Sequence, residues 1–451
     1  MKVYNNILDV IGETPIVRLN KITGASDANV YAKLEFLNPG GSIKDRIALH
    51  IINKAEKDGM LKKGGTIVEN TSGNTGAGLA IVSAVRGYKA IFTIPDKMSS
   101  EKINFLKAFG AKVVVTPTNV PADSPQSYYE TAKRIHQTTE NSFYVNQYHN
   151  PENPEAHYNS TGPEIWDQMD GKIDYIVAGI GTGGTLSGVA RYLKEKNPDI
   201  KVIAVDPVGS VFYDYFKSGK LIEPHVYKVE GVGEDMLVDA LDFNLIDDII
   251  QVNDKDSFMT ARDLARNEGI FAGGSSGSAV WGALQIAKKA GPGKNILTIL
   301  PDTGFRYLSK LYNDEWMQDN GLIEITLSGS VGDLLKRKPK KSLISTDSSS
   351  AISDVIRMMK DNNISQMPVI DNERLVGLIT ENNLLNFLIG NENDKNHTIS
   401  DLIETQIQTT TETDPISDVL KKLKSTDAVL VLEDKKVKDI LTKIDLIDLL
   451  A

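Results

Sequence analysis

The chain contains no cysteine. This absence excludes disulfide bonds, thiolate metal sites and a cysteine nucleophile. Its six histidines show no ligand spacing, so we expect no structural zinc and no metal cofactor. Long apolar runs are also missing, and Asp9 and Glu13 come before any such run near the N-terminus. We therefore expect a cytoplasmic protein that has no membrane partner.

A basic excess is missing as well. The sequence has 50 Lys and Arg residues against 60 Asp and Glu residues, which gives a net charge of -10. The acidic excess is spread over both parts of the chain, and this argues against nucleic acid as a partner. With 451 residues, 41% hydrophobic and 24% charged, the composition is that of a globular protein of two or three domains.

Short apolar runs alternate with helical patterns up to about residue 320. The runs are residues 66–68, 90–94, 112–115, 175–177, 202–205 and 296–300. Continuous apolar strands separated by helices indicate parallel sheet. The pattern predicts a layered α/β domain over residues 1–320, with ligands bound at the carboxyl ends of the strands.

The remaining residues carry an internal repeat. Residues 352–355 (Ile-Ser-Asp-Val) recur at 416–419, and residues 377–385 are echoed by 439–447 in the same order. Two matches in nearly one register indicate a duplicated unit of strands and helices. We predict a linker at residues 321–330 and an α+β module at 331–451, with repeats at about 331–390 and 398–451.

Lys44 lies in the stretch Gly-Gly-Ser-Ile-Lys-Asp-Arg, residues 40–46. Apolar residues at helical spacing from Ile47 predict a helix, with Ser42 as its N-cap and Asp45 completing a capping box. The positive end of the helix dipole disfavours an ammonium there and favours the neutral amine that a Schiff-base lysine requires. The alternative is an ordinary solvated lysine, which is the commoner state of this residue.

Two strand-to-helix loops offer anion sites. Residues 69–76 (Glu-Asn-Thr-Ser-Gly-Asn-Thr-Gly) combine hydroxyls with backbone amides at a helix start, which suits a carboxylate. Residues 179–185 (Gly-Ile-Gly-Thr-Gly-Gly-Thr) suit a phosphate. Helix capping alone would also explain the first loop.

The second loop has a competing interpretation. Gly179, Gly181 and Gly184 satisfy the dinucleotide pattern, and Asp206 ends the next strand, where a ribose-binding acid is sought. A dinucleotide-binding domain fused to a nucleotide-sensing module is therefore the alternative. It would leave Lys44 and residues 71–76 without a task, so a single phosphate-bearing cofactor explains the set more economically. A fourth loop, residues 273–278, is similarly rich in Gly and Ser.

Together, Lys44 in its setting and residues 71–76, 181–185 and 273–275 resemble the β-family of pyridoxal phosphate (PLP) enzymes, which have the type II fold. Within that family, residues 85–88, 97–102 and 229–233 are most similar to the cystathionine β-synthases, whereas cysteine synthases share only the cofactor loops closely. The C-terminal duplication resembles the paired CBS repeats of a Bateman module. The chain starts too late for the haem-binding extension of the animal enzymes and has no cysteine to ligate haem, so we expect none.

The resemblance implies roles for particular residues. Lys44 would form the internal aldimine, Asn74 would contact the ring hydroxyl, and Ser275 would face the pyridine nitrogen. The phosphate would be held by Gly181, Thr182, Gly183, Gly184 and Thr185. The substrate would be bound by Thr71, Ser72, Thr75, Gln147, Tyr148, Gly231 and Glu234.

The implied reaction joins L-serine or O-acetylserine to L-homocysteine through an aminoacrylate and gives L-cystathionine. Glu234 stands where the animal enzymes have tyrosine; we expect it at the mouth of the site, near the ammonium group of homocysteine. The alternative is a cysteine synthase that uses O-acetylserine and sulfide. A homodimer or higher homo-oligomer is expected.

The module resembles sensors of adenosyl ligands. Thr442 and Asp445 would bind ribose or phosphate, with Gln366 of the first repeat beside them. In the first repeat, Thr380 is followed by Asn383 instead of an acid, so the second half is the more credible site. S-adenosylmethionine is the expected ligand and an adenine nucleotide the alternative. The other possibility is an extension that only supports oligomerisation.

Overall fold

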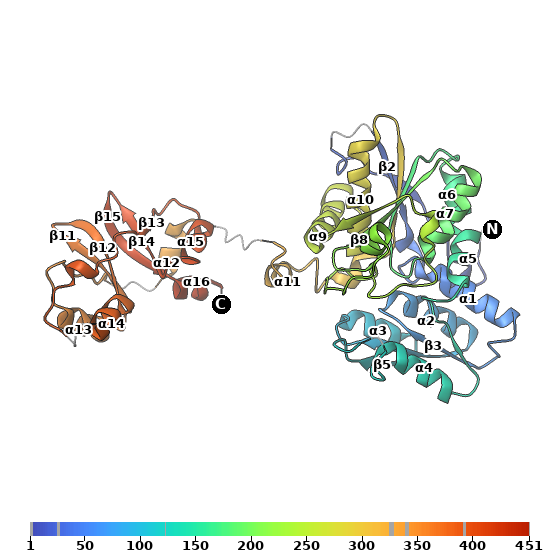
Figure 1. Cartoon of the computed structure of the whole chain (residues 1–451), viewed down its shortest axis with the longest axis horizontal. Coiled ribbons are helices and arrows are strands. Elements are labelled where there is room, and N and C mark those ends of the chain that lie inside the picture. The colour runs from blue at the N-terminus through green and yellow to red at the C-terminus, as the bar shows by residue number, and fades with distance from the viewer. Residues whose placement is uncertain are drawn as a thin grey trace. The chain divides into compact units, whose positions relative to one another are not determined.

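The structure is a computed structural model of the whole chain, and it describes residues 3–24, 28–121, 123–323, 329–338, 342–390 and 394–450. Two compact units, Met1–Ile323 and Glu324–Ala451, make up the chain (Figure 1). Part of the predicted linker, residues 324–328, lies outside the described residues. Each unit is described by itself.

The first unit contains a large sheet with the strand order β1-β2-β10-β7-β8-β9. All neighbouring strands are parallel except β1, which pairs antiparallel with β2. The parallel sheet predicted from the apolar runs is thus confirmed. The strands are β1 (Ile16–Arg18), β2 (Asn29–Leu34), β7 (Tyr175–Gly179), β8 (Lys201–Pro207), β9 (Asp248–Val252) and β10 (Asn295–Leu300).

A second, smaller sheet of the same unit has the order β5-β4-β3-β6 and is parallel throughout. Its strands are β3 (Thr66–Asn70), β4 (Lys89–Pro95), β5 (Lys112–Thr116) and β6 (Ser142–Tyr144). All five residues of β3 are buried, because helices cover the sheet on both faces and leave no solvated side for this strand.

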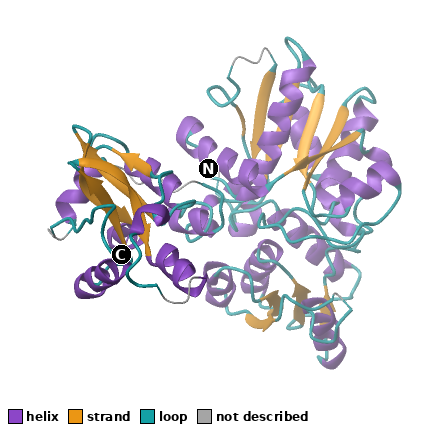
Figure 2. Ribbon diagram, turned by 60° about the vertical axis from the view of Figure 1, so that its left-hand side comes forward, coloured by secondary structure: helices purple, strands orange, loops and turns teal. Residues whose placement is uncertain are grey.

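Helices pack on both sheets of the first unit (Figure 2). They are α1 (Lys44–Lys57), α2 (Asn74–Arg86), α3 (Ser100–Ala108), α4 (Tyr128–Thr138), α5 (Glu152–Asn159), α6 (Thr161–Gln168), α7 (Gly184–Lys196), α8 (Phe212–Ser218), α9 (Asp254–Asp263), α10 (Gly274–Ala290) and α11 (Asp314–Asp319). Short turns of other helix types are η1 (Ile7–Val10), η2 (Glu35–Leu37), η3 (Phe243–Leu245), η4 (Leu264–Glu268) and η5 (Gly304–Tyr307).

Helix α1 is held close to α2, and this contact fixes the position of Lys44. Ile47, Ile51 and Ile52 of α1 are buried in the core that α2 and the small sheet share. A Cβ on Gly78 of α2 would lie 3.0 Å from the Lys44 carbonyl oxygen. The two backbones can approach this closely only because residue 78 is glycine.

The second unit begins with α12 (Val331–Arg337), whose first turn has a capping box between Ser330 and Asp333. The first repeat contains α13 (Ile352–Asn362), β11 (Gln366–Asp371), β12 (Arg374–Thr380) and α14 (Glu381–Gly390). The turn η6 (Ile399–Leu402) and strand β13 (Gln408–Thr410) follow. The second repeat contains α15 (Ile416–Leu423), β14 (Ala428–Glu433), β15 (Lys436–Thr442) and α16 (Lys443–Leu450).

The two repeats share one geometry. Each pairs two antiparallel strands between helices, and each strand pair shifts register once, after Val369 in one repeat and after Val431 in the other. This confirms the duplication predicted from the sequence. Within the described ranges, no helix is long and apolar enough to cross a membrane. No group of three or more His, Cys, Asp or Glu side chains among these residues could hold a metal ion.

Candidate active site

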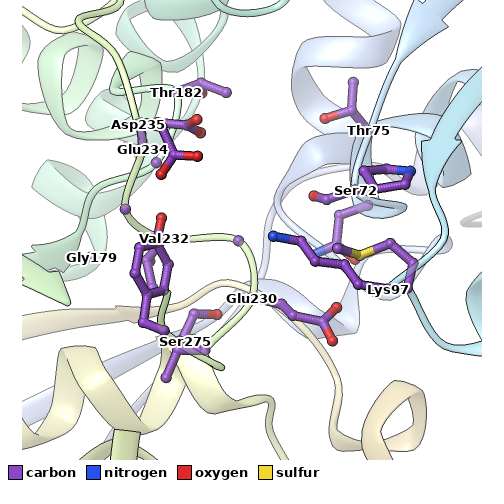
Figure 3. Close-up of a pocket in the computed structure, with 18 of the residues that line it drawn as sticks. Ser72, Thr75, Lys97, Gly179, Thr182, Glu230, Val232, Glu234, Asp235 and Ser275 are labelled. Atoms are coloured by element: carbon purple, nitrogen blue, oxygen red, sulfur yellow. The ribbon is translucent and has the colours of Figure 1, made fainter. Parts of the chain in front are cut away.

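A cavity of about 650 Å³ opens in the first unit, beyond the carboxyl ends of β3 and β7. Figure 3 shows Ser72, Thr75 and Lys97 on one wall and Glu234 and Asp235 on the facing wall. Of the residues predicted for the cofactor and substrate, the following line it: Lys44, Ser72, Asn74, Thr75, Gln147, Tyr148, Gly181, Thr182, Gly183, Thr185, Gly231, Glu234 and Ser275. Segments far apart in the sequence therefore meet at one site.

Lys44 is the first residue of α1 and opens into this cavity. Burial lowers the pKa of its ammonium group from 10.5 to about 8, although Glu234 and Asp302 act in the opposite direction. Removal from water is thus the largest influence, larger than the nearby charges. The result is an amine whose neutral fraction near physiological pH far exceeds that of an ordinary lysine.

The capping box predicted at the start of α1 is not formed. The N-cap is Ile43, and the Ser42 hydroxyl accepts a hydrogen bond of 3.3 Å from the Lys44 amide. Asp45 turns the other way and accepts a 2.5 Å hydrogen bond from the Gly40 amide. Asp45 is fully buried, so its carboxylate stabilises the turn before the helix instead of capping it.

The glycines after β7 allow another segment to pack against this loop. A Cβ on Gly179 would lie 2.6 Å from Val232, and one on Gly181 would lie 2.7 Å from the Gly231 carbonyl oxygen. The Gly233 amide donates a 2.7 Å hydrogen bond to the Ile180 carbonyl. Close packing of residues 231–233 therefore explains two glycines of the apparent dinucleotide pattern.

The same loop presents free backbone donors. Gly183 has a φ of +81° and directs the chain into α7. The amides of Gly183, Gly184 and Thr185 donate to no acceptor among the described residues. Such amides at the start of a 13-residue helix form an anion site together with the positive end of its dipole.

Two hydroxyls of this loop are held by buried side chains. Thr182 Oγ1 accepts a 3.1 Å hydrogen bond from the Asn153 amide. Thr185 Oγ1 lies 3.1 Å from Nε2 of His157, whose Nδ1 lies 2.9 Å from Thr161 Oγ1. Both hydroxyls are thereby fixed at the loop.

Thr71 and Gly184 do not line the cavity, which differs from the expected direct contacts. Thr71 is fully buried and its hydroxyl accepts hydrogen bonds from the Gly73 and Gly76 amides, so it shapes the loop from within. Gly184 faces Asn153, and a Cβ on Gly184 would overlap the Asn153 amide. Packing against Asn153 therefore requires a glycine here, and the residue can contribute to the loop only through its backbone.

The carboxylate loop is linked to Gln147. Thr75 Oγ1 donates a 2.6 Å hydrogen bond to Gln147 Oε1, and Gln147 Nε2 donates to the Asn70 carbonyl at 3.3 Å. Ser72 lies beside them on the cavity wall and its hydroxyl has no partner in the described part of the chain. The Ser72 hydroxyl and a backbone amide at the start of α2 are therefore available as donors to an incoming carboxylate.

The Asn74 side chain is clamped from two sides. Its amide donates a 2.8 Å hydrogen bond to Asp302, and its carbonyl oxygen accepts from Arg306. Arg306 also donates to the Gly40 carbonyl, just before Lys44. Asn74 therefore keeps a single N–H for another partner, in a fixed direction. Ser275, in the first turn of α10, is 2% exposed and lines the same cavity.

Glu234 is the titratable side chain that faces Lys44 across the cavity. Burial raises the pKa of its carboxyl to about 8; Asp235 adds to this effect, while Lys44 and Lys97 oppose it. The acid is therefore largely neutral at pH 7 until a further positive charge arrives.

Several residues of the site were not found from the sequence. Tyr128 and Tyr129 line the cavity, and the Tyr128 hydroxyl lies 3.2 Å from that of Tyr148. Glu230 pairs with Lys102 and with Lys310, the latter at 2.6 Å. Burial opposes the charge on Glu230, but the two lysines outweigh it and lower its pKa. No local pattern could have found the Glu230 pairs, because Lys310 and Lys102 are 80 and 128 positions away from it.

Asp206 does not serve as a ribose-binding acid. Its carboxylate is fully buried, lies off the cavity wall and accepts a 3.0 Å hydrogen bond from the Tyr213 amide. Burial raises its pKa to about 7. The dinucleotide interpretation therefore lacks the ribose-binding acid that it requires.

In the second unit, Thr442 and Asp445 form a local pair. The Asp445 carboxylate accepts hydrogen bonds from the Thr442 amide at 2.7 Å and from its hydroxyl at 2.8 Å, and Lys338 Nζ lies 3.4 Å away. Thr380 and Asn383 make the equivalent turn in the first repeat. Gln366 Nε2 donates weakly to the Asp427 carbonyl at 3.5 Å, so the first repeat reaches the second at this point.

Comparison with known proteins gives the family. The family model described as pyridoxal-phosphate dependent enzyme matches residues 7–302, and that of the CBS domain matches residues 331–390 and 399–451. The chain is 38% identical to a cystathionine beta-synthase of Dictyostelium discoideum, over 99% of this chain and 92% of that protein. It is 46% identical to a cysteine synthase of Staphylococcus aureus, over 68% of this chain and 96% of that protein.

Among solved structures, the O-acetylserine dependent cystathionine beta-synthase of Helicobacter pylori superposes with a TM-score of 0.63 at 37% identity. The match covers 69% of this chain and 99% of that one. The chain thus belongs to the family of pyridoxal-phosphate-dependent enzymes. It is an enzyme of the lyase type with two C-terminal CBS domains, and its similarity to cystathionine β-synthases confirms the resemblance seen in the sequence. These relatives support PLP-dependent β-replacement chemistry.

The cavity fits this cofactor. The amides of residues 183–185 are free to receive a phosphate, and Lys44 opens into the same space as an amine of lowered pKa. Ser275 contributes a hydroxyl and Asn74 one amide N–H to the walls of the same cavity. The donor set matches a molecule with a phosphate, an aldehyde and a polar ring.

Proposed function

We propose that the chain joins L-serine or O-acetylserine to L-homocysteine and forms L-cystathionine in a PLP-dependent β-replacement. The observation that supports this most is the position of Lys44, as an amine of lowered pKa in one cavity with an anion loop and a hydroxyl-rich loop. A solvated lysine, the alternative considered from the sequence, would keep its ordinary pKa.

Four parts of the chain would hold the cofactor. Lys44 would bind it covalently through Nζ, and residues 181–185 would receive the phosphate. Asn74 would donate its remaining N–H to the ring hydroxyl. Ser275 would face the ring nitrogen, where a neutral hydroxyl does not hold a proton as a carboxylate would. Bound PLP supplies an electron-withdrawing ring that stabilises negative charge at the α-carbon of the substrate.

The chain's own residues would then position the substrate and move protons. Ser72, Thr75 and Gln147 would bind the α-carboxylate of the first amino acid, with Tyr148 and Gly231 bordering it. Lys44, with its pKa of about 8, is a base suited to remove the α-proton near neutral pH and to return a proton to the departing β-substituent.

The alternative function is that of a cysteine synthase, in which sulfide replaces homocysteine. The similarity to the Staphylococcus aureus cysteine synthase supports it. Sulfide has neither carboxylate nor ammonium and would make no use of acidic side chains at the cavity mouth. Glu234 and Asp235 at that mouth therefore favour the amino-acid acceptor.

Steady-state rates with each pairing of serine or O-acetylserine with homocysteine or sulfide test the proposal. We expect cystathionine formation with homocysteine as the better acceptor, and no turnover by Lys44→Ala. If sulfide far outperforms homocysteine, the enzyme is functionally a cysteine synthase. If Lys44→Ala turns over at the wild-type rate, the assignment of Lys44 is wrong.

For the second unit we propose one adenosyl ligand, with S-adenosylmethionine as the first candidate and AMP or ATP as alternatives. The CBS domain match supports a ligand of this class. Because Asp445 is paired with Thr442 in the structure, a ribose would have to share or replace those hydrogen bonds. Calorimetric titration of the full chain, wild type beside Asp445→Ala, tests this; no binding to the wild type would favour a structural extension.

A further inference from the structure

The mouth of the cavity carries a lysine on one wall and two acidic side chains on the facing wall. Figure 3 shows Lys97 projecting from one wall toward the wall that carries Glu234 and Asp235. Lys97 and Lys44 are also the cations that act most on the Glu234 carboxyl. The mouth is therefore polarised across its width.

Two other lysines of this region, Lys102 and Lys310, are not equally available. Lys102 is nearly fully buried and is paired with Glu230, and Lys310 pairs with the same carboxylate at 2.6 Å. The Lys97 ammonium has no carboxylate partner among the residues that the structure describes. A ligand carboxylate would thus meet Lys97 without displacing an ion pair.

The backbone of Lys97 is fixed although its side chain is exposed. Its amide donates to Thr118 Oγ1 at 3.3 Å, and its carbonyl accepts from Lys310 Nζ at 3.3 Å. Thr118 in turn donates a 2.5 Å hydrogen bond to Asp96. The base of the lysine is therefore held at the rim, which reduces the ordering needed on binding.

The opposite wall is fixed in a similar way. The Glu234 amide donates a 3.1 Å hydrogen bond to Ser210 Oγ, and the Gly233 amide is bound to Ile180. The carboxyl groups of Glu234 and Asp235 have no hydrogen-bond partner within the described ranges and both line the cavity. They offer two acceptors side by side to a cation.

We propose that Lys97 binds the α-carboxylate of the acceptor and that Asp235, with Glu234, receives its α-ammonium, so that the enzyme selects a thiol carried on an α-amino acid. This rests on the proposed function and adds the residues that choose the second substrate. A zwitterion placed across the mouth satisfies both walls at once. Sulfide or a simple alkanethiol satisfies neither.

Homocysteine and two analogues separate the two contacts. γ-Mercaptobutyrate keeps the carboxylate and lacks the amine, whereas γ-mercaptopropylamine keeps the amine and lacks the carboxylate. Each is measured as acceptor at saturating first substrate, and its kcat/KM is divided by that for sulfide in the same variant. This ratio cancels changes in cofactor content and in handling of the first substrate.

For Lys97→Ala we expect the ratio to fall roughly tenfold for homocysteine and γ-mercaptobutyrate, chiefly through KM, with γ-mercaptopropylamine unaffected. Asp235→Asn should show the converse selectivity. Lys97→Arg should restore part of the loss. Lys228→Ala, which removes another lysine of the cavity lining, is the matched control and should leave all ratios near wild type.

Equal losses for all acceptors, or no change in any ratio, would overturn the proposal, as would a carboxylate-specific loss in Lys228→Ala alone. Failure of the proposed function has a different signature. In that case the wild-type enzyme would consume the first substrate with sulfide but form no thioether with homocysteine.

Discussion

Nε2 of His157 and Oγ1 of Thr185 lie 3.1 Å apart beneath the anion loop. Burial lowers the pKa of His157 well below its usual value, so the ring is neutral and has one donor and one acceptor. If Thr161 donates to Nδ1, Nε2–H donates to Thr185, and the Thr185 hydroxyl keeps its proton for a phosphate oxygen.

This series of hydrogen bonds, from Thr161 through His157 to Thr185, predicts that a residue outside the cavity affects cofactor binding. Thr161→Val removes the hydroxyl that sets the tautomer, and we expect PLP to bind the apoprotein about fivefold more weakly, which corresponds to about 1 kcal/mol. Thr161→Ser keeps the hydroxyl and is the control. Equal dissociation constants for the Val and Ser variants in a PLP titration would contradict the proposed tautomer.

The lowered pKa of Lys44 predicts how cofactor binding depends on pH. Only the neutral amine attacks an aldehyde, so the rate at which apoprotein takes up PLP should rise with pH and level off above about 8. An ordinary lysine would level off near 10.5. The rate is followed by the absorbance of bound cofactor, and Lys44→Ala, which cannot bind it covalently, is the control.

Glu234 predicts a pH-dependent stability of the apoprotein. Between its ordinary pKa of 4.5 and its folded pKa of about 8, the folded state holds a proton that the unfolded state has lost. Stability conferred at this site therefore falls as pH rises through that window. Glu234→Gln removes the decline.

We expect urea unfolding to show Glu234→Gln more stable than wild type at about pH 8.5, with the advantage shrinking toward about pH 4.5. Glu130→Gln, a change of a partly exposed acid in α4 that pairs with Lys133, serves as the matched control. If the free energy of unfolding of Glu234→Gln differs from that of wild type by the same amount at both pH values, the raised pKa of this carboxyl is not the cause of the difference.

Arg46 predicts a large loss of stability. Its guanidinium pairs with Glu35 of η2 at 2.8 Å and with Glu164 of α6 at 2.6 Å, and the Glu35 side chain is fully buried. Arg46→Met would leave a buried carboxylate with Lys33 as its remaining cation, and we expect a loss of about 3–5 kcal/mol in urea unfolding.

The double variant Arg46→Met with Glu35→Gln removes the stranded charge and should recover part of that loss. No recovery would mean that packing around Arg46, instead of charge, causes the effect.

Much of the cofactor site could be predicted from the sequence, because each of its loops precedes a helix and contains its own chemistry in a few consecutive residues. Lys44, Ser72, Thr75 and the 181–185 loop are examples, and all but Gly184 of these line one cavity. The parallel sheets followed from the apolar runs for the same reason.

The parts that were missed depend on distant pairings. Glu230 and Lys102 are separated by 128 positions, and nothing near either residue indicates the other. The capping box at Ser42 failed because Asp45 found a better donor in the Gly40 amide, which only the folded turn supplies. Thr71 was expected at the substrate, but the turn of its own loop uses its hydroxyl.

The contact between Gly184 and Asn153 also bears on how such an enzyme can diversify. Any side chain at residue 184 would collide with Asn153, so that position cannot vary without rebuilding the cofactor loop. Lys97 and Asp235 are exposed, so their side chains are not confined by a buried neighbour in this way. Mutational drift can therefore act on the choice of nucleophile while the cofactor machinery stays intact, and a laboratory search for new thiol acceptors would best begin with those two codons.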